Sequence, residues 1–201
     1  MLSVETDLGI EVAVLHLHEL EVTEPRSDFD VEIAAAEAAA RAGQVGDVGP
    51  SRALYRRFGV DPTKHRPSNE ALLRRVRRGE TLPRVNSLVD VGNLVSLRLQ
   101  VPVGLYDLAS VQGELTVRLG RPGESYAGIR KETVNVAGRL CVADDLGACG
   151  NPSGDSARTM ITTSTEQAAW ISFLPMAERG LRLIYELVAR YGRGLVRVVS
   201  R

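Results

Sequence analysis

The order of apolar and polar residues along the chain predicts its secondary structure. Residues 10–18 alternate between the two kinds, which is typical of a strand. Helical spacing or alanine-rich composition predicts helices over residues 30–43, 51–59, 69–79, 85–98 and 176–192. Ser27 or Asp28 is the expected N-cap of the first helix, and Ser68 is that of the third.

Beyond the fourth helix, short alternating segments are separated by turn residues. Strands are expected over residues 113–120, 125–130, 139–145 and 157–163, and a loop over residues 151–156. Residues 165–174 leave two alternatives open: Ser164 and Gln167 have capping-box spacing, which predicts a helix, whereas AAWISFL also fits a strand. Helices first, strands in the middle and a helix at the end predict an α+β fold.

One predicted helix carries an unusual polar stripe. In residues 82–107, LPRVNSLVDVGNLVSLRLQVPVGLYD, the residues Asn86, Asp90 and Asn93 interrupt a mostly apolar segment at spacings of four and three. Those spacings place side chains on one helix face. A solvated face usually carries Lys, Glu, Gln and Arg, which are better helix formers. The stripe is therefore expected either to bond neighbouring loops from a buried position or to line a cavity for a polar ligand.

Charge is unevenly distributed, although 25 basic and 25 acidic residues cancel. Residues 1–51 hold eleven acidic and two basic residues, and residues 52–78 hold nine basic and two acidic ones. The basic cluster fits the phosphates of a nucleic acid, a contact that is independent of sequence. The alternative is two solvated helical faces that pair with the acidic N-terminal region. Aromatic residues make up only 4%, so a stacking platform for single strands is not expected.

Several kinds of site find no support in the sequence. Cys141 and Cys149 form no CxxC pair, and histidines at 16, 18 and 65 are a poor ligand set, so neither a metal nor a cofactor is expected. GxSxG, P-loop and GxGxxG motifs are absent, and no histidine lies near Ser156 in sequence to activate it. Without a signal peptide or an apolar run near ~20 residues, we expect a soluble cytoplasmic protein and no membrane partner.

Four segments, in this order, resemble a known family: LPRVNSLVDVGNLVSLRLQVPVGLYDL, GELTVRLG, VADDLG and DSARTMITTSTEQ. They resemble the editing region, the B3/B4 domain, of the phenylalanyl-tRNA synthetase beta subunit, and more closely the freestanding proteins that consist of this domain alone. YRRFGVDPTKHRPSNEALLRRVRRG is similar to the N-terminal part of that group. The resemblance predicts a B3/B4-like domain over residues 50–201, with residues 1–49 as a strand and helix packed on it.

The resemblance implies a β-sandwich of unusual topology flanked by helices. In the synthetase this domain hydrolyses tyrosine misattached to the phenylalanine tRNA, in a pocket near the counterpart of the Asn86–Asn93 helix. The synthetase has a histidine where this chain has Gly104, and glycine is expected to leave more room. The acidic group that reads the tyrosine hydroxyl falls near Gly154–Asp155. Tyrosine specificity is therefore not expected to carry over.

Three functions follow as hypotheses. The favoured one is trans-acting hydrolysis of the ester of a mischarged aminoacyl-tRNA by a positioned water, with the aminoacylated 3′ end of tRNA as partner. The others are a binding module that kept the fold without the chemistry, and a hydrolase with a non-tRNA acyl substrate. The residues expected to orient substrate and water are Asn86, Asn93, Asp155, Arg158 and Thr159. The expected substrate pocket holds Asp90, Gly104 and Tyr106. The arginines expected to hold phosphates are Arg56, Arg57, Arg74, Arg75 and Arg78.

Overall fold

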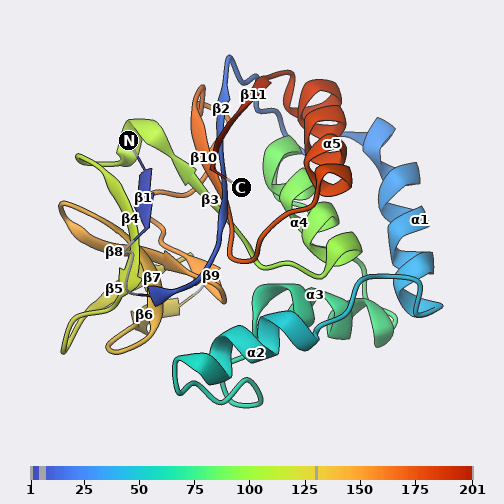
Figure 1. Cartoon of the computed structure of the whole chain (residues 1–201). Helices are drawn as coiled ribbons and strands as arrows, with labels where there is room; N and C mark the ends of the chain where they lie inside the picture. The colour runs from blue at the N-terminus through green and yellow to red at the C-terminus, as the bar shows by residue number, and fades with distance from the viewer. Residues whose placement is uncertain (1, 5–7, 130, 201) are drawn as a thin grey trace.

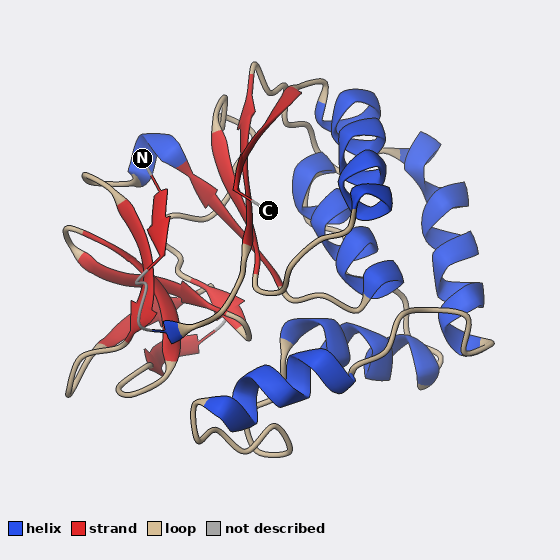
Figure 2. Ribbon diagram, viewed as in Figure 1, coloured by secondary structure: helices blue, strands red, loops and turns tan. Residues whose placement is uncertain are grey.

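Two β-sheets pack face to face, and helices cover the outer face of one of them (Figures 1 and 2). The computed structural model describes residues 2–4, 8–129 and 131–200. The helices are α1 (Asp30–Arg41), α2 (Gly49–Arg57), α3 (Ser68–Arg77), α4 (Ser87–Leu99) and α5 (Glu178–Leu187), with 3-10 turns at Ser27–Phe29 and Leu108–Ser110 and a π turn at Val188–Gly192.

The two sheets differ in size and strand direction. The antiparallel four-stranded sheet has the order β11 (Leu195–Ser200), β2 (Ala13–His18), β10 (Ala168–Ser172) and β3 (Val103–Asp107). The five-stranded sheet has the order β1 (Leu2–Val4), β4 (Leu115–Leu119), β7 (Leu140–Asp144), β8 (Gly147–Asn151) and β9 (Gly154–Asp155), with β1 parallel to β4 and the other neighbours antiparallel. β5 (Ser125–Gly128) and β6 (Lys131–Asn135) form a hairpin. The predicted α+β sandwich flanked by helices is thus confirmed.

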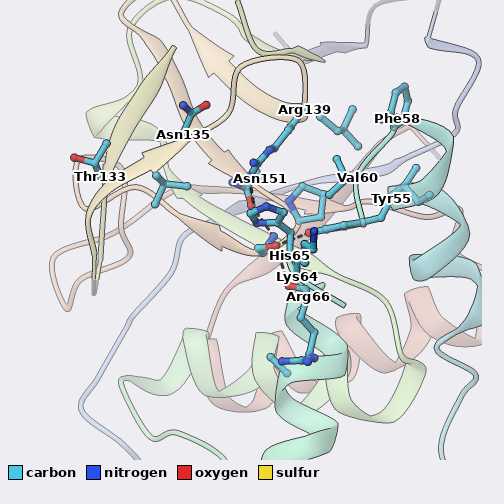
Figure 3. A pocket seen from close by; sticks show the side chains of 16 residues that line it. Tyr55, Phe58, Val60, Lys64, His65, Arg66, Thr133, Asn135, Arg139 and Asn151 are labelled. Atoms are coloured by element: carbon cyan, nitrogen blue, oxygen red, sulfur yellow. Dashed lines mark hydrogen bonds between the residues drawn. The ribbon is translucent and has the colours of Figure 1, made fainter. Parts of the chain in front are cut away.

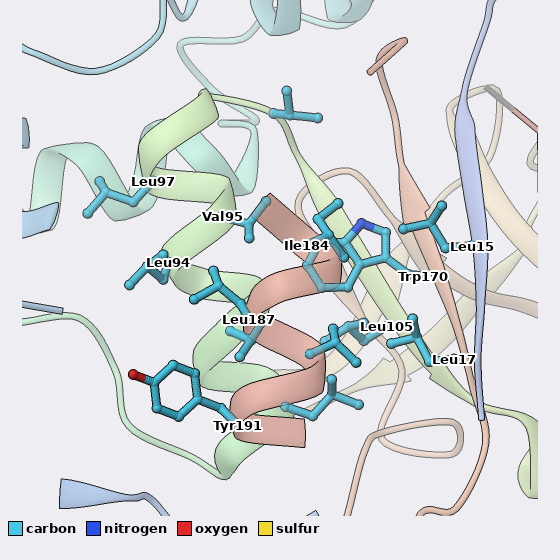
Figure 4. Packing of buried hydrophobic residues seen from close by; sticks show 14 of the residues in the cluster. Leu15, Leu17, Leu94, Val95, Leu97, Leu105, Trp170, Ile184, Leu187 and Tyr191 are labelled. Carbon is cyan, nitrogen blue, oxygen red and sulfur yellow. The ribbon is translucent and has the colours of Figure 1, made fainter. Parts of the chain in front are cut away.

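Alternate residues of the four-stranded sheet supply two separate cores. On β10, Trp170 belongs to the cluster under the helices, whereas Ile171 belongs to the cluster between the sheets. Leu15 and Val14 divide in the same way on β2, as do Leu105 and Tyr106 on β3. Figure 4 shows Leu15, Leu17 and Trp170 facing α4 and α5. Because both of its faces are buried, β10 (AAWIS) reads as a continuous apolar run.

Helix α4 lies at the centre of the helical layer and contacts α1, α3, α5 and β3. Leu88, Leu94, Val95 and Leu97 are all fully buried, so the helix is enclosed on most sides. Such a helix has no solvated face, and this explains why the segment lacks Lys and Glu. Across the part of the chain that the structure describes, no helix is long and apolar enough to cross a membrane.

The N-terminal region contributes a strand to the four-stranded sheet and a helix to the helical layer. β2 pairs with β10 on one side and with β11 on the other, and α1 packs on α3 and α4. Its acids pair with arginines outside the basic cluster: Asp30 with Arg84, and Glu32 with Arg98 and Arg190. The division between residues 49 and 50 stays a prediction.

Several local predictions were wrong. Residues 165–174 form no helix, because Trp170 and Ile171 must face opposite cores, which only the strand alternative allows. Residues 157–163, all described, form bends, turns and irregular backbone in place of a strand. Neither Ser27 nor Asp28 caps α1, whose first turn continues from a 3-10 turn, and Ser68 is the first helical residue of α3, after Pro67.

Candidate functional site

The polar residues at the start of α4 hold neighbouring loops. Asn86 is the N-cap: its side chain accepts a hydrogen bond from the Val89 amide at 2.9 Å and donates one to the Ile161 carbonyl at 3.1 Å. The first bond satisfies a free amide of the helix end. The second fixes the irregular segment 157–167. Asn86 thus ties α4 to the segment that separates β9 from β10.

Asp90 and Asn93 bond the segment that precedes α4. The buried Asp90 carboxylate accepts hydrogen bonds from Arg84 Nε at 2.6 Å and from the Val85 amide at 2.8 Å. Asn93 Nδ2 donates to the Pro83 carbonyl at 3.3 Å. Of the two alternatives for the stripe, these bonds fit the buried, loop-holding one. The stripe residues line none of the three cavities described below.

Gly104, Tyr106, Asp155 and Thr159 come together where β3 meets β8 and β9, a region here named the β3–β9 seam. The Tyr106 ring is fully buried there, against two glycines. A β-carbon on Gly104 would lie 2.5 Å from the Tyr106 hydroxyl, and one on Gly150 would also overlap it. The extra room expected at Gly104 is therefore filled by Tyr106, and that expectation was wrong.

The Asp155 carboxyl is the unusual ionisable group of the seam. Oδ2 accepts a hydrogen bond from the Leu105 amide at 3.2 Å. Oδ1 is sealed from solvent and has no hydrogen-bond partner, and the same is true of the neighbouring Tyr106 hydroxyl. Burial raises the pKa of Asp155 to about 7, although the Leu105 amide and Tyr106 oppose the shift. A carboxyl with a pKa near neutrality can take or give a proton under ordinary conditions.

Arg158 and Thr159 also have partners inside the protein. Arg158 forms a two-pronged ion pair with Asp144, with both N–O distances 2.8 Å, and donates to the Ser110 carbonyl. Burial alone would raise the pKa of Asp144, but the hydrogen bonds from Arg158 and from the Gln112 and Leu146 amides, together with the Arg158 charge, outweigh it and lower the pKa. Thr159 is fully buried, with its hydroxyl 3.5 Å from the Cys149 carbonyl. Both residues therefore brace the segment that leads out of β9.

The basic cluster is neutralised in part, and by acids of its own region. Glu70 pairs with Arg52 and Arg66, and Glu80 pairs with Arg75 and Arg78. Among the described residues, these ion pairs do not show the alternative in which the basic cluster pairs with the acidic N-terminal region.

Among the arginines predicted to bind phosphates, Arg75 and Arg78 form ion pairs, whereas the other three show no ion pair within the described residues. Arg57 donates to the Leu8 carbonyl. Arg56 and Arg74 are exposed and, within the described residues, form no ion pair with a carboxylate. These two are the cations best placed to meet an external phosphate.

A cavity with a partly polar lining lies elsewhere, between the α2–α3 region and β6. It has a volume of about 490 Å³ and is here named the α2–β6 cavity. Figure 3 shows Lys64, His65 and Arg139 pointing into it beside Tyr55 and Phe58. The lining residues are Leu54, Tyr55, Phe58, Val60, Lys64, His65, Arg66, Ala71, Thr133, Val134, Asn135, Arg139, Leu140, Asn151, Pro152 and Ser153.

The sequence analysis missed this cavity, because its residues come from segments that lie far apart in the sequence and match no motif. Two more hollows, of about 780 and 230 Å³, lie beside α5 and beside β2. Among the described residues, no group of His, Cys, Asp and Glu is arranged to hold a metal ion. Burial raises the pKa of the Cys149 thiol to about 12, which makes it a poor nucleophile.

Comparison with known proteins places the chain in a family. The model of the B3/4 domain matches residues 51–196. The chain belongs to the B3/4 domain family. The beta subunit of phenylalanine–tRNA ligase from Rhodopseudomonas palustris is 32% identical over 140 residues, which are 66% of this chain and 17% of the relative. That from Psychrobacter arcticus is 32% identical over 120 residues, 55% of this chain and 15% of the relative.

This B3/4 domain therefore spans about a sixth of the length of those relatives. A crystal structure of an N-terminal fragment of the phenylalanyl-tRNA synthetase beta subunit from Pyrococcus horikoshii aligns with a TM-score of 0.49 at 13% identity. The alignment covers 98% of this chain and 49% of that one.

Proposed function

We propose that this protein hydrolyses the ester bond of mischarged aminoacyl-tRNA in trans, with the Asp155 carboxylate as general base. Support for the substrate comes from the B3/4 family and from relatives named as beta subunits of phenylalanine–tRNA ligase. Ligation itself is not proposed, because the chain matches only a small part of those subunits.

The observation that carries the proposal is the state of Asp155. Its pKa is raised to about 7, so near neutral pH about half of the carboxyl groups are ionised and able to accept a proton. Tyr106 stands beside it with a buried hydroxyl that lacks a hydrogen bond. Burial first and Asp155 second raise the pKa of Tyr106 well above its usual range, so the hydroxyl keeps its proton and remains a donor.

The proposed step removes one amino acid per water. Because Asp155 Oδ1 is sealed from solvent in this structure, the step requires the β3–β9 seam to open to the ester and to one water molecule. Asp155 Oδ1 then takes a proton from that water, whose oxygen attacks the ester carbonyl. The carbon–oxygen bond to the terminal ribose then breaks, the ribose oxygen regains a proton, and the amino acid leaves as a free acid. The Tyr106 hydroxyl is the donor that would stabilise the negative charge on the carbonyl oxygen. Arg158 and Thr159 act as positioning residues, because they brace the segment that leads out of β9. Asn86 supports the same segment at Ile161, whereas Asn93 acts only on the segment that precedes α4.

The tRNA body would lie against the basic cluster. Arg56 and Arg74 contribute most in this proposal, because they carry no ion pair with a described carboxylate, and Arg57, Arg75 and Arg78 contribute less. Contacts of this kind to phosphates make binding steeply dependent on salt. Reversing the charge of Arg56 and Arg74 should weaken tRNA binding and leave the fold intact, whereas Arg182→Glu on α5 serves as a matched control.

A second function, binding of tRNA without hydrolysis, is favoured by a different observation. Tyr106 fills the space beside Gly104, and Arg158 is held by Asp144. Both arrangements reduce the number of groups that are free to contact an acyl ester. In this alternative the protein would bind aminoacyl-tRNA tightly and protect or deliver it.

The experiment is a deacylation assay with the purified protein and a panel of tRNAs charged with wrong amino acids. Asp155→Asn is the test variant, and Asp145→Asn, which alters an exposed carboxyl on the β7–β8 turn, is its control. Hydrolysis that Asp155→Asn alone abolishes supports the enzyme. Salt-sensitive binding without hydrolysis selects the binding module. Hydrolysis of simple amino-acid esters without any tRNA would instead point to a non-tRNA acyl substrate.

A further inference from the structure

The α2–β6 cavity has the chemistry of a site for a phosphorylated ligand, and it holds none of the residues assigned to hydrolysis above. Lys64, His65, Arg66 and Arg139 are all among its lining residues. No Asp or Glu is among them. A cavity lined by cations without carboxylates selects anions, because a buried anion needs a compensating charge.

Two of these cations, Lys64 and Arg139, have no described carboxylate that balances their charge. Arg66 Nε lies 3.4 Å from Glu70, so its charge is balanced in part. Lys64 and Arg139 form no ion pair with a carboxylate within the described part of the chain. Arg139 Nη1 lies 3.2 Å from His65 Nδ1. Since a guanidinium only donates, His65 accepts at Nδ1 and is neutral with its proton on Nε2. This hydrogen bond orients the Arg139 guanidinium, and it leaves the positive charge of that group without a compensating negative charge.

The cavity also has apolar and aromatic lining. Leu54, Tyr55, Phe58, Val60 and Leu140 supply this part of it. Burial raises the pKa of Tyr55 to about 12, so its hydroxyl does not add negative charge. A ligand that matches both the cationic and the apolar lining has an anionic group and a flat or apolar body.

The cavity is held in shape by contacts across its base. The Tyr55 hydroxyl and Ser153 Oγ are 2.5 Å apart, and Ser153 Oγ donates to the Arg66 carbonyl at 2.9 Å. The Ser68 amide donates to the Pro152 carbonyl at 2.9 Å. These bonds join the α2–α3 region to the β8–β9 turn. A preformed site of about 490 Å³ is of the size that small ligands use, roughly 300–1,000 Å³.

We propose that the α2–β6 cavity binds a nucleoside 5′-monophosphate unit, either as a free nucleotide or as a nucleotide of an RNA strand. The phosphate lies between Arg139 and Lys64, and the base lies against Phe58 and Val60. Asn135 supplies an amide that can bond the edge of a base: its Oδ1 already accepts from the Ala137 amide, which leaves Nδ2 to donate. This site goes beyond the proposed hydrolysis and does not depend on it.

Calorimetric titration of the full-length chain with adenosine 5′-monophosphate tests the proposal. Saturable binding is expected, with adenosine at least tenfold weaker. Arg139→Ala and Lys64→Ala should each weaken binding about tenfold or more, the usual loss when a charge-assisted hydrogen bond is removed. Arg182→Ala, on α5, should stay within twofold of the unaltered protein. A short RNA ending in adenosine, titrated in parallel, distinguishes the two sources of the nucleotide.

A second variant, Asn135→Asp, tests the proposal if Arg139→Ala fails to fold. Asn135→Asp retains the oxygen that accepts from Ala137 but adds a negative charge at the exposed edge of the cavity. It should abolish binding, whereas Asn135→Ala should reduce it only a few-fold. Saturable binding of neither the nucleotide nor the RNA at millimolar concentration would overturn the proposal. Inorganic phosphate binding as tightly as the nucleotide would also overturn it. None of these titrations measures deacylation, so the two proposals fail separately.

Discussion

The Tyr106 hydroxyl lies 2.5 Å from the position that a β-carbon on Gly104 would occupy. Two ring carbons of Tyr106 lie 2.9 Å from the same point. Tyr106 is fully buried between the two sheets, so any side chain at residue 104 would overlap its ring in this packing. The seam that holds Asp155 thus depends on a small residue two positions before a large one.

Gly104→Ala should destabilise the fold. The added methyl group overlaps a buried ring, and overpacking of this kind costs about 1–3 kcal/mol. Thermal or urea unfolding measures the loss. Tyr106→Phe in the same chain should recover part of it, because the atom nearest to the new methyl is gone. Gly154→Ala is the matched control: a β-carbon there meets nothing within 4 Å, and its stability should stay within ~0.5 kcal/mol.

Tyr106→Phe alone should leave stability unchanged or slightly higher. The hydroxyl is buried without a hydrogen bond, so its removal leaves no partner stranded. Tyr126→Phe provides the contrast, because the Tyr126 hydroxyl donates to the Gly154 carbonyl at 2.5 Å. Loss of that bond should cost about 1 kcal/mol. A loss at Tyr106 larger than the loss at Tyr126 would mean that the Tyr106 hydroxyl has a partner in solution.

The raised pKa of Asp155 predicts a pH-dependent gain for Asp155→Asn. Burial lifts this pKa from 3.8 to about 7, so the folded chain holds a proton that the unfolded chain releases. The resulting stability is fully present below about pH 4 and is lost as the pH rises through about 7. Asparagine resembles the protonated form.

The variant should therefore be more stable than the unaltered protein at pH 8, by at most about 4 kcal/mol at 1.36 kcal/mol per pKa unit. The difference should shrink toward pH 4, and urea unfolding at several pH values measures it. Asp145→Asn, at an exposed carboxyl, should match the unaltered protein within ~0.5 kcal/mol. A constant difference between Asp155→Asn and the parent at all pH values would show that Asp155 titrates normally.

The ion pair between Arg118 and Glu124 predicts the opposite trend. Two hydrogen bonds of 2.7 Å join the buried groups, and the Arg118 bond lowers the pKa of Glu124 to about 2 despite burial. Glu124→Gln should cost roughly 3 kcal/mol at pH 7, because it breaks a buried pair. The paired carboxylate stabilises the fold above about pH 4.5, and this stability is lost as the pH falls through about 2.

The deficit of Glu124→Gln should accordingly shrink in acid. Glu178→Gln breaks the exposed pair with Arg182 and should change stability by less than ~0.5 kcal/mol at any pH. Equal effects of the two variants at pH 7 would contradict this account of Glu124.

Sequence patterns located most of the helices, because each one has a regular apolar spacing and a clear stop. Strands in which apolar and polar residues alternate, such as β4, were found by that alternation. β10 was ambiguous, since both of its faces are buried and its sequence reads as one apolar run. β11 has alternating valines but was missed within the C-terminal tail. Its partner β2 lies far away in sequence, and no local signal marks that pairing.

The candidate site was predictable only in part. The resemblance pointed to Gly104, Tyr106 and Asp155 together, and the fold does bring them to one seam. The sequence alone could not predict the side-chain packing, in which the Tyr106 ring occupies the space beside Gly104. Nor could it predict the pKa of Asp155, which depends on burial by segments distant in sequence. The α2–β6 cavity could not be predicted for the same reason, since segments that lie far apart in the sequence line it.

The most direct measurement is the pH dependence of single-turnover deacylation of mischarged tRNA, made with the unaltered protein and with Asp155→Asn. The account predicts a rate that rises with pH and levels off above a midpoint near 7, and a loss of about 100-fold or more in the variant. Full activity in Asp155→Asn, or no hydrolysis above the uncatalysed rate for any charged tRNA in the panel, would contradict it.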